Sequence, residues 1–211
     1  MKKKFGLPLL AAAALSVSLF AGQAHAACAV KHVPGSEKSI SHKGLNQALL
    51  ERAILANINA ERCRRGLSPL ASNAGLRKQA ARHSAWMASA RRLSHKATRG
   101  NRSLNARLKA SGMRYRAGAE NIGVMNVYNI HGRHFMIRAA SSCNFTTTSG
   151  QRINKHSYAS LARLATRLWM ESPGHRKNIL KRNVSYSGIG GAIQPAAAHC
   201  GEVFLTHIFA G

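Results

Sequence analysis

The apolar residues in the first half of the chain recur at helical spacing. Within residues 45–65 the main stripe consists of three residues four positions apart, Leu50, Ile54 and Ile58, as expected for one face of a helix. A second helix, capped by Ser72 or Asn73, is predicted to run to about Ala90. A shorter third helix is predicted at residues 103–111, just before a glycine that can end it.

The second half of the chain alternates between apolar and polar residues and predicts strands around one further helical region. Three strands are predicted, at residues 119–127, 184–193 and 202–209. Between them a helix opens at Ser157, and Pro173 and Gly174 break it before a short second helix. Strands and helices do not alternate regularly, so the class is α+β, with helices packed on a small, mainly antiparallel sheet.

The segment between the first predicted strand and Ser157 has no clear period. Its residues 124–157 are predicted to be mostly loop, with one strand near residues 135–137. A loop of this length in a small domain is usually functional or held by a covalent link. Cys143 lies within it and favours the second explanation.

The first 26 residues resemble an export signal and not a folded segment. Three lysines precede a short apolar run, and Ala24-His25-Ala26 fits the cleavage site of a signal peptide. We therefore divide the chain into a signal peptide at 1–26, an N-terminal arm at 27–44 and one domain at 45–211. No later stretch is apolar enough to span a bilayer, so the mature protein is expected to be secreted or periplasmic.

Four cysteines remain after the signal peptide, and an even number in an exported chain indicates disulfides. Three pairings of Cys28, Cys63, Cys143 and Cys200 are possible. We favour Cys28 with Cys63 and Cys143 with Cys200. None of the four has the CxxC spacing of a redox motif or a structural zinc site.

The charge balance is the most unusual feature of the composition. The chain has 32 Lys and Arg against six acidic residues, for a formal net charge of +26. Such a surface attracts anionic envelope components and other polyanions, but no motif indicates specific nucleic-acid recognition. The alternative is a solvated basic surface with no single partner, because net charge alone does not select one.

Four short motifs in a fixed order resemble the CAP superfamily of cysteine-rich secretory proteins, antigen 5 and pathogenesis-related 1 proteins, in its bacterial SCP-domain form. They are Asn59–Leu70, Leu93-Ser94-His95, Ala119-Glu120-Asn121-Ile122 and Trp169–His175. The resemblance extends from about Ile54 to Phe209. It implies a three-layer α-β-α sandwich with a central cavity, and a monomeric protein is expected.

The resemblance also implies a polar tetrad in the cavity, formed here by His95, Glu120, Glu171 and His175. Two imidazoles and two carboxylates can hold a divalent metal such as zinc, with His95 and His175 as its ligands, or they can transfer protons. The alternative is structural, with Glu120 as a buried hydrogen-bond acceptor. His83, on an apolar stripe, is interpreted as a core histidine.

Three functions compete. The preferred one is an exported, non-enzymatic CAP-domain protein that binds a ligand or an envelope component. The second is a metal-assisted hydrolase or peptidase that uses the His/Glu cavity, with an activated water in place of a side-chain nucleophile. The third is a polyanion-binding protein that acts through its basic surface.

Overall fold

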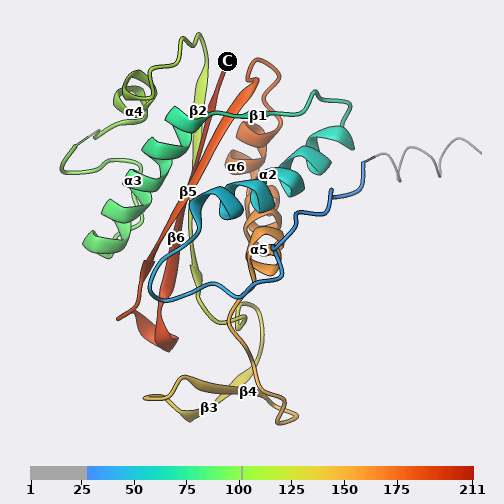
Figure 1. Cartoon of the computed structure of the whole chain (residues 1–211), viewed down its shortest axis with the longest axis vertical. Helices are drawn as coiled ribbons and strands as arrows, with labels where there is room; N and C mark the ends of the chain where they lie inside the picture. The colour runs from blue at the N-terminus through green and yellow to red at the C-terminus, as the bar shows by residue number, and fades with distance from the viewer. Residues whose placement is uncertain (1–27, 101) are drawn as a thin grey trace, which may run out of the picture.

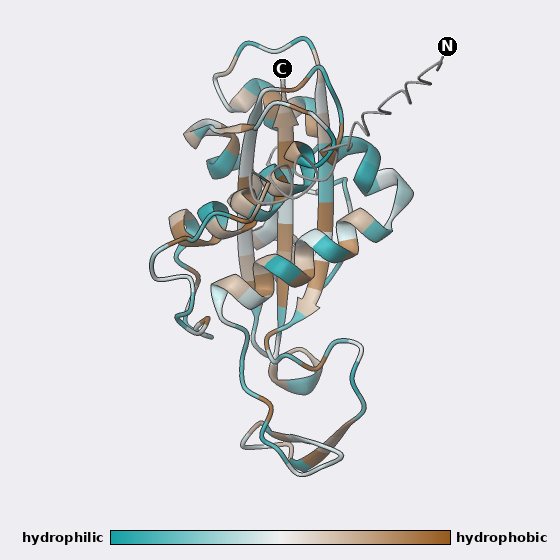
Figure 2. Ribbon diagram, turned by 90° about the vertical axis from the view of Figure 1, so that its right-hand side faces the viewer, coloured by the Kyte–Doolittle hydropathy of each residue, from teal (hydrophilic) through white to brown (hydrophobic). Residues whose placement is uncertain are grey.

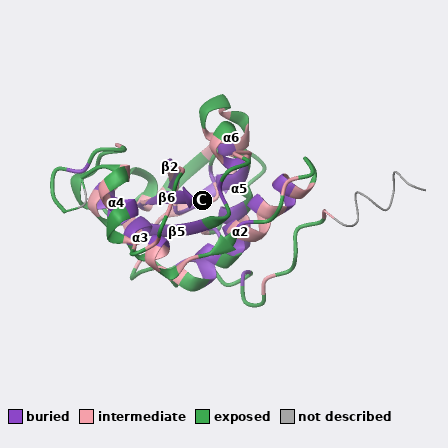
Figure 3. Cartoon of the chain, turned by 90° about the horizontal axis from the view of Figure 1, so that it is seen from above, coloured by how far each residue is buried: buried purple, intermediate pink, exposed green. Residues whose placement is uncertain are grey.

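A four-stranded sheet runs through the molecule and carries helices on both faces (Figures 1 and 3). The computed structural model describes residues 28–100 and 102–211. The predicted signal peptide lies outside these residues. The three layers confirm the predicted α+β sandwich.

The sheet has the strand order β1-β5-β6-β2. Its strands are β1 (Ala71–Ser72), β2 (Gly118–Asn126), β5 (Tyr186–Gln194) and β6 (Glu202–Ala210). β6 is antiparallel to both of its neighbours, and only the two-residue β1 is parallel to β5. The sheet is therefore mainly antiparallel, as predicted, and β2 forms one edge of it.

One face of the sheet is covered by two helices, α3 (Ala74–Ala90) and α4 (Leu104–Ala110). The other face is covered by α2 (Gln47–Cys63), α5 (Tyr158–Glu171) and α6 (Pro173–Ile179). Polar side chains cap four of these helices by accepting a backbone N–H: Asn46, Asn73, Ser103 and Ser157. Asn73, and not Ser72, caps α3.

The larger part of the core lies between the sheet and α2 and α5. Trp169 of α5 is 1% exposed, and its indole Nε1 donates to the carbonyl of Ile122 on β2 at 3.1 Å. On the opposite face α3 lies almost directly on β5. Gly188 and Gly190 permit this approach, because a Cβ on either would lie 2.2 Å from the backbone of α3.

The break between α5 and α6 occurs one residue earlier than predicted. Ser172 has an extended backbone, with ψ of 120°, and Pro173 is the first residue of α6. Proline fits there because the first helical N–H needs no partner and the residue before proline is driven away from the helical region. Gly174 lies inside α6, so the predicted helix break at Gly174 was wrong.

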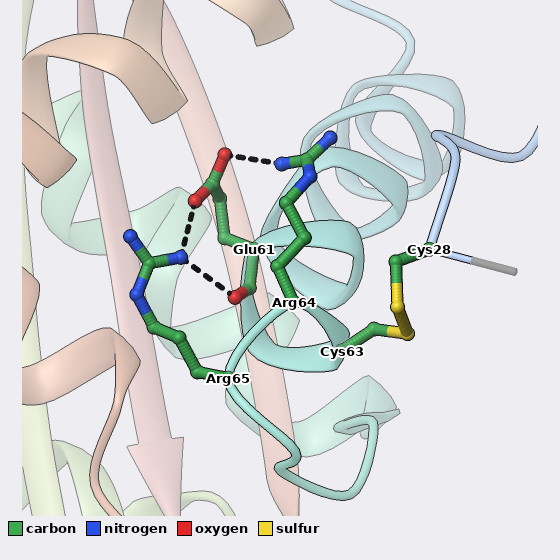
Figure 4. The surroundings of a disulfide bond; sticks show 5 residues. All are labelled: Cys28, Glu61, Cys63, Arg64 and Arg65. Carbon is green, nitrogen blue, oxygen red and sulfur yellow. Dashed lines mark hydrogen bonds and ion pairs between the residues drawn. A yellow bond between two sulfur atoms is a disulfide. The ribbon is translucent and has the colours of Figure 1, made fainter. Parts of the chain in front are cut away.

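The long segment after β2 forms a second, two-stranded sheet of β3 (Phe135–Ala139) and β4 (Asn144–Thr147). Cys143, between these strands, is bonded to Cys200 in the short 3₁₀ turn η1 (Ala198–Cys200). The other disulfide joins Cys28 to Cys63 at the end of α2 (Figure 4). Both favoured pairings are confirmed, whereas β4 was not predicted.

Among the helices of the described residues, none is both long and apolar enough to cross a membrane.

Three histidines are buried in the core and have a nitrogen without a hydrogen-bond partner: His83, His156 and His207. Burial lowers the pKa of His207 to about 3 and those of His83 and His156 to about 4. His207 Nε2 lies 2.7 Å from Ser187 Oγ. Both residues are fully buried, so this serine–histidine pair is part of the core and is closed to a substrate.

The glycine contact between β5 and α3 yields the first prediction. Gly190→Ala should lower the free energy of unfolding by about 3 kcal/mol, because the added methyl group meets helix backbone that cannot move aside. Gly174→Ala is the control, since a Cβ there meets nothing within 4 Å. Denaturant unfolding measures both, and equal changes would contradict the close packing.

The buried histidines predict loss of stability in acid. Because the folded-state pKa of His207 is depressed below its ordinary 6.5, its stabilising effect is present above that pH and is lost as pH falls toward the folded value. Between about pH 7 and about pH 5 His207 alone should cost about 2 kcal/mol of unfolding free energy. Denaturant unfolding at the two pH values should show a smaller loss of unfolding free energy in His207→Gln than in the wild type, and an unchanged loss in the exposed control His32→Gln.

Candidate functional site

The candidate site is built around an ion pair between β2 and α4. Arg107 Nε donates to Glu120 Oε2 at 2.8 Å, and its Nη2 donates to Oε1 at 2.7 Å. The two side chains are 1% and 2% exposed. This is a bidentate, charge-assisted pair with both partners removed from water, and it engages both oxygens of the carboxylate.

His95 lies on the loop after α3 and completes the contacts of this carboxylate. Its Nδ1 lies 2.8 Å from Glu120 Oε1, while its carbonyl accepts from Arg107 Nη2 at 2.9 Å. With the carboxylate as acceptor, Nδ1 carries the proton. The side chain is 55% exposed, so the ring is held at Nδ1 by the buried Glu120 while the rest of it reaches solvent.

Two opposing effects set the protonation of Glu120. Burial alone raises its pKa, but the hydrogen bonds from His95 and Arg107 outweigh burial, and the net pKa lies below the usual value. The carboxylate is therefore ionised near neutral pH. An ionised carboxylate that already accepts three hydrogen bonds is a poor general base.

His175 approaches the same edge strand from the other helical layer. Asn121 Nδ2 donates to the His175 carbonyl at 3.1 Å, and Asn178 Nδ2 donates to Asn121 Oδ1 at 2.9 Å and to the Glu120 carbonyl at 3.2 Å. Burial lowers the pKa of the half-buried His175, and the nearby His95 lowers it further. The charge of one imidazole thus affects the protonation of the other across the edge of β2.

The structure brings together His95, Glu120 and His175 but places Glu171 elsewhere. Glu171 ends α5 with a side chain that is 58% exposed and contacts Arg167 at 3.2 Å. It lines a surface pocket that also includes Arg64 and Arg176. No contact joins Glu171 to the other three, because Pro173 starts a new helix that turns His175 toward β2.

Arg107 is the residue of this site that was not predicted from the sequence. It was treated only as one position of the short third helix. A signal was present, since Arg107 lies three residues after Leu104 and directly before the buried Leu108, on the apolar side of that helix. A cation at such a position requires a buried anion.

The donor set fits a tetrad-bound metal poorly. Zinc sites use three or four protein ligands, whereas Glu120 is engaged by Arg107 and Glu171 is distant, which leaves two imidazoles. Within residues 28–100 and 102–211, no group of three or more His, Cys, Asp or Glu side chains is placed to hold a metal ion. What the site offers chemically is the exposed, oriented imidazole of His95 and the half-buried imidazole of His175, whose pKa His95 lowers.

The comparisons with known proteins agree with this fold and motif order. The sequence profile of the CAP family, described as the cysteine-rich secretory protein family, matches residues 55–208, and the chain belongs to this family. No curated protein matches the chain in sequence.

Two solved structures are similar in fold. One is an extracellular protein containing an SCP domain from Bacillus anthracis, with 20% identity and a TM-score of 0.50; the match covers 79% of this chain and 44% of that one. The other is an outer surface protein from Borrelia burgdorferi, with 12% identity and a TM-score of 0.50, covering 79% and 96%. The chain thus matches less than half of the Bacillus protein.

Arg107→Met tests the ion pair. Removing one member of a buried pair leaves an uncompensated charge, so the variant should lose about 3–5 kcal/mol of unfolding free energy. The double variant Arg107→Met/Glu120→Met should recover most of this loss, because no buried charge remains. Denaturant unfolding of both variants measures the coupling. Additive losses would show that the two groups do not depend on each other.

Proposed function

We propose that this protein is an exported, non-enzymatic binding protein for anionic components of the cell envelope, with the His95–His175 edge as part of its binding surface. The observation that carries this proposal is the buried ion pair between Glu120 and Arg107. With this carboxylate neutralised, the exposed groups of the site are imidazole N–H donors and cations, which suit an anion.

The remaining acidic residues are too few to cancel the positive field. Glu51 contacts Arg77 at 2.6 Å, and Glu61 contacts Arg64 and Arg65 at 2.6 and 2.7 Å (Figure 4). Together with Glu120 and Glu171, four of the six glutamates are bound to arginine. Little negative charge is left to offset the lysines and arginines of the surface, so an anionic polymer meets almost no repulsion.

Export is supported by two further observations. The two disulfides suit an oxidising compartment, and the neighbours in fold include an extracellular and an outer surface protein. Cleavage after Ala26 remains a prediction.

The hydrolase alternative requires a group to activate water. Glu120 is held by three hydrogen bonds, and a metal at His95 and His175 would have two protein ligands, so neither supplies the activation readily. Binding is therefore the better supported function. Peptide or ester turnover that is abolished in Glu120→Gln would contradict this choice.

Binding of the mature protein to purified lipopolysaccharide tests the proposal. Affinity should fall about tenfold or more when salt rises from about 50 to about 200 mM, because counterions compete for the cations. Binding that does not respond to salt, or none at low salt, would contradict the proposal.

A matched pair of variants tests the place of binding. Lys96→Gln/Lys177→Gln removes two exposed cations near His95 and His175, and Lys38→Gln/Lys43→Gln removes two exposed cations from the N-terminal arm. The first variant should weaken binding about tenfold relative to the second. Equal losses would show that the whole surface binds and that the histidine edge has no special part.

A further inference from the structure

The hairpin arm, residues 131–152, projects from the end of the sandwich opposite the C-terminus (Figure 1). It contains β3 and β4, which pair with each other and, among the strands of the described chain, with no other; β4 is also bridged to Arg152. No helix of the described residues covers this small sheet, in contrast to the central sheet (Figures 1 and 2). Its outer surface is therefore open.

β3 carries two adjacent exposed apolar residues. Met136 is 44% exposed and Ile137 is 53% exposed. Five large apolar side chains are exposed in the described chain, and these are the two that are neighbours. Consecutive strand residues point to opposite faces, so an edge-on approach of the narrow ribbon brings both into contact with one surface.

Cations surround this apolar pair. Exposed arginines lie within or beside the two strands, at Arg133, Arg138 and Arg152. The sequence has no acidic residue between Glu120 and Glu171. The arm is therefore uniformly positive, with an apolar edge in its middle.

The base of the arm is rigid. Phe135 packs against Phe145 and His199, with ring centroids 5.8 and 5.3 Å apart, and Tyr128 packs against Phe145 at 5.0 Å. The Cys143–Cys200 disulfide ties the arm to the β5–β6 connection. Because the inward side chains are fixed, Met136 and Ile137 remain outside at little further cost in conformational entropy.

We propose that the hairpin arm docks on an anionic phospholipid bilayer, with Met136 and Ile137 entering the interface and the arginines contacting lipid phosphates. An apolar tip flanked by cations is the pattern of peripheral membrane binding. This inference rests on the proposed function and adds to the histidine edge a second contact, at the arm, with one lipid class. A second copy of the chain fits less well, because two uniformly positive arms would repel each other.

Co-sedimentation with phosphatidylcholine vesicles that contain about 30 mol % phosphatidylglycerol tests the inference. Met136→Ser/Ile137→Ser should reduce the partition coefficient about tenfold. The control Val30→Ser/Tyr186→Ser removes two exposed apolar groups of 44% and 42% exposure outside the arm and should bind like the wild type.

Charge is tested by a second matched pair. Arg133→Gln/Arg138→Gln should weaken binding about tenfold more than Arg114→Gln/Arg116→Gln, whose exposed arginines lie near the C-terminal end of the sandwich. Brominated acyl chains should also quench the fluorescence of the tryptophan introduced by Ile137→Trp, whereas they should not quench that of the tryptophan introduced by Tyr186→Trp. Quenching reports insertion directly and does not depend on the stability of the variants.

The outcomes separate this inference from the proposed function. Two results would overturn the docking of the hairpin arm and leave the proposed function standing. The first is wild-type protein that binds lipopolysaccharide but not these vesicles. The second is arm variants that bind the vesicles like the wild type. A change in oligomeric state of Met136→Ser/Ile137→Ser without lipid would point to a second copy and overturn the membrane assignment. Failure to bind lipopolysaccharide would overturn the proposed function independently.

Discussion

The buried pair of Arg107 and Glu120 is the contact on which the candidate site depends. It joins α4 to the edge strand β2, and through the carbonyl of His95 it also fixes the irregular segment between α3 and α4. His83 anchors the same segment from α3, since its Nε2 lies 3.0 Å from the Ser94 carbonyl. Two charges removed from water are stable only with this degree of hydrogen bonding. The exposed imidazole of His95 is therefore positioned by two buried side chains, Arg107 and Glu120.

Much of the fold could be predicted because its determinants are local. Apolar spacing places the helices, and alternation places β2, β5 and β6, within about two residues of their observed bounds. The short strands β1 and β4 were missed, since two to four residues carry too little pattern. The helix break predicted at Gly174 was wrong because the extended Ser172 and Pro173 at the start of α6 already separate the two helices.

The site was less predictable because its decisive contacts join distant residues. Motif order indicated His95, Glu120 and His175, and the structure brings these three to the edge of β2. Nothing local distinguishes Arg107 from the other arginines except its place on an apolar helix face. Likewise Glu171 precedes His175 by only four residues, yet its side chain contacts Arg167 on the surface. Which carboxylate meets which cation is decided by the packing of whole layers.

Charge and apolar contact act over different distances in this molecule, and neither suffices alone for attachment to a surface. With a formal charge of +26, long-range attraction extends over about a Debye length, roughly 8 Å at physiological salt, and has no preferred orientation. Two half-exposed apolar side chains supply too little burial for stable attachment on their own. In the proposed docking, attraction raises the local concentration at an anionic surface, and the open edge of β3 then selects one orientation, with the histidine edge of β2 on the part of the molecule that faces away from the arm.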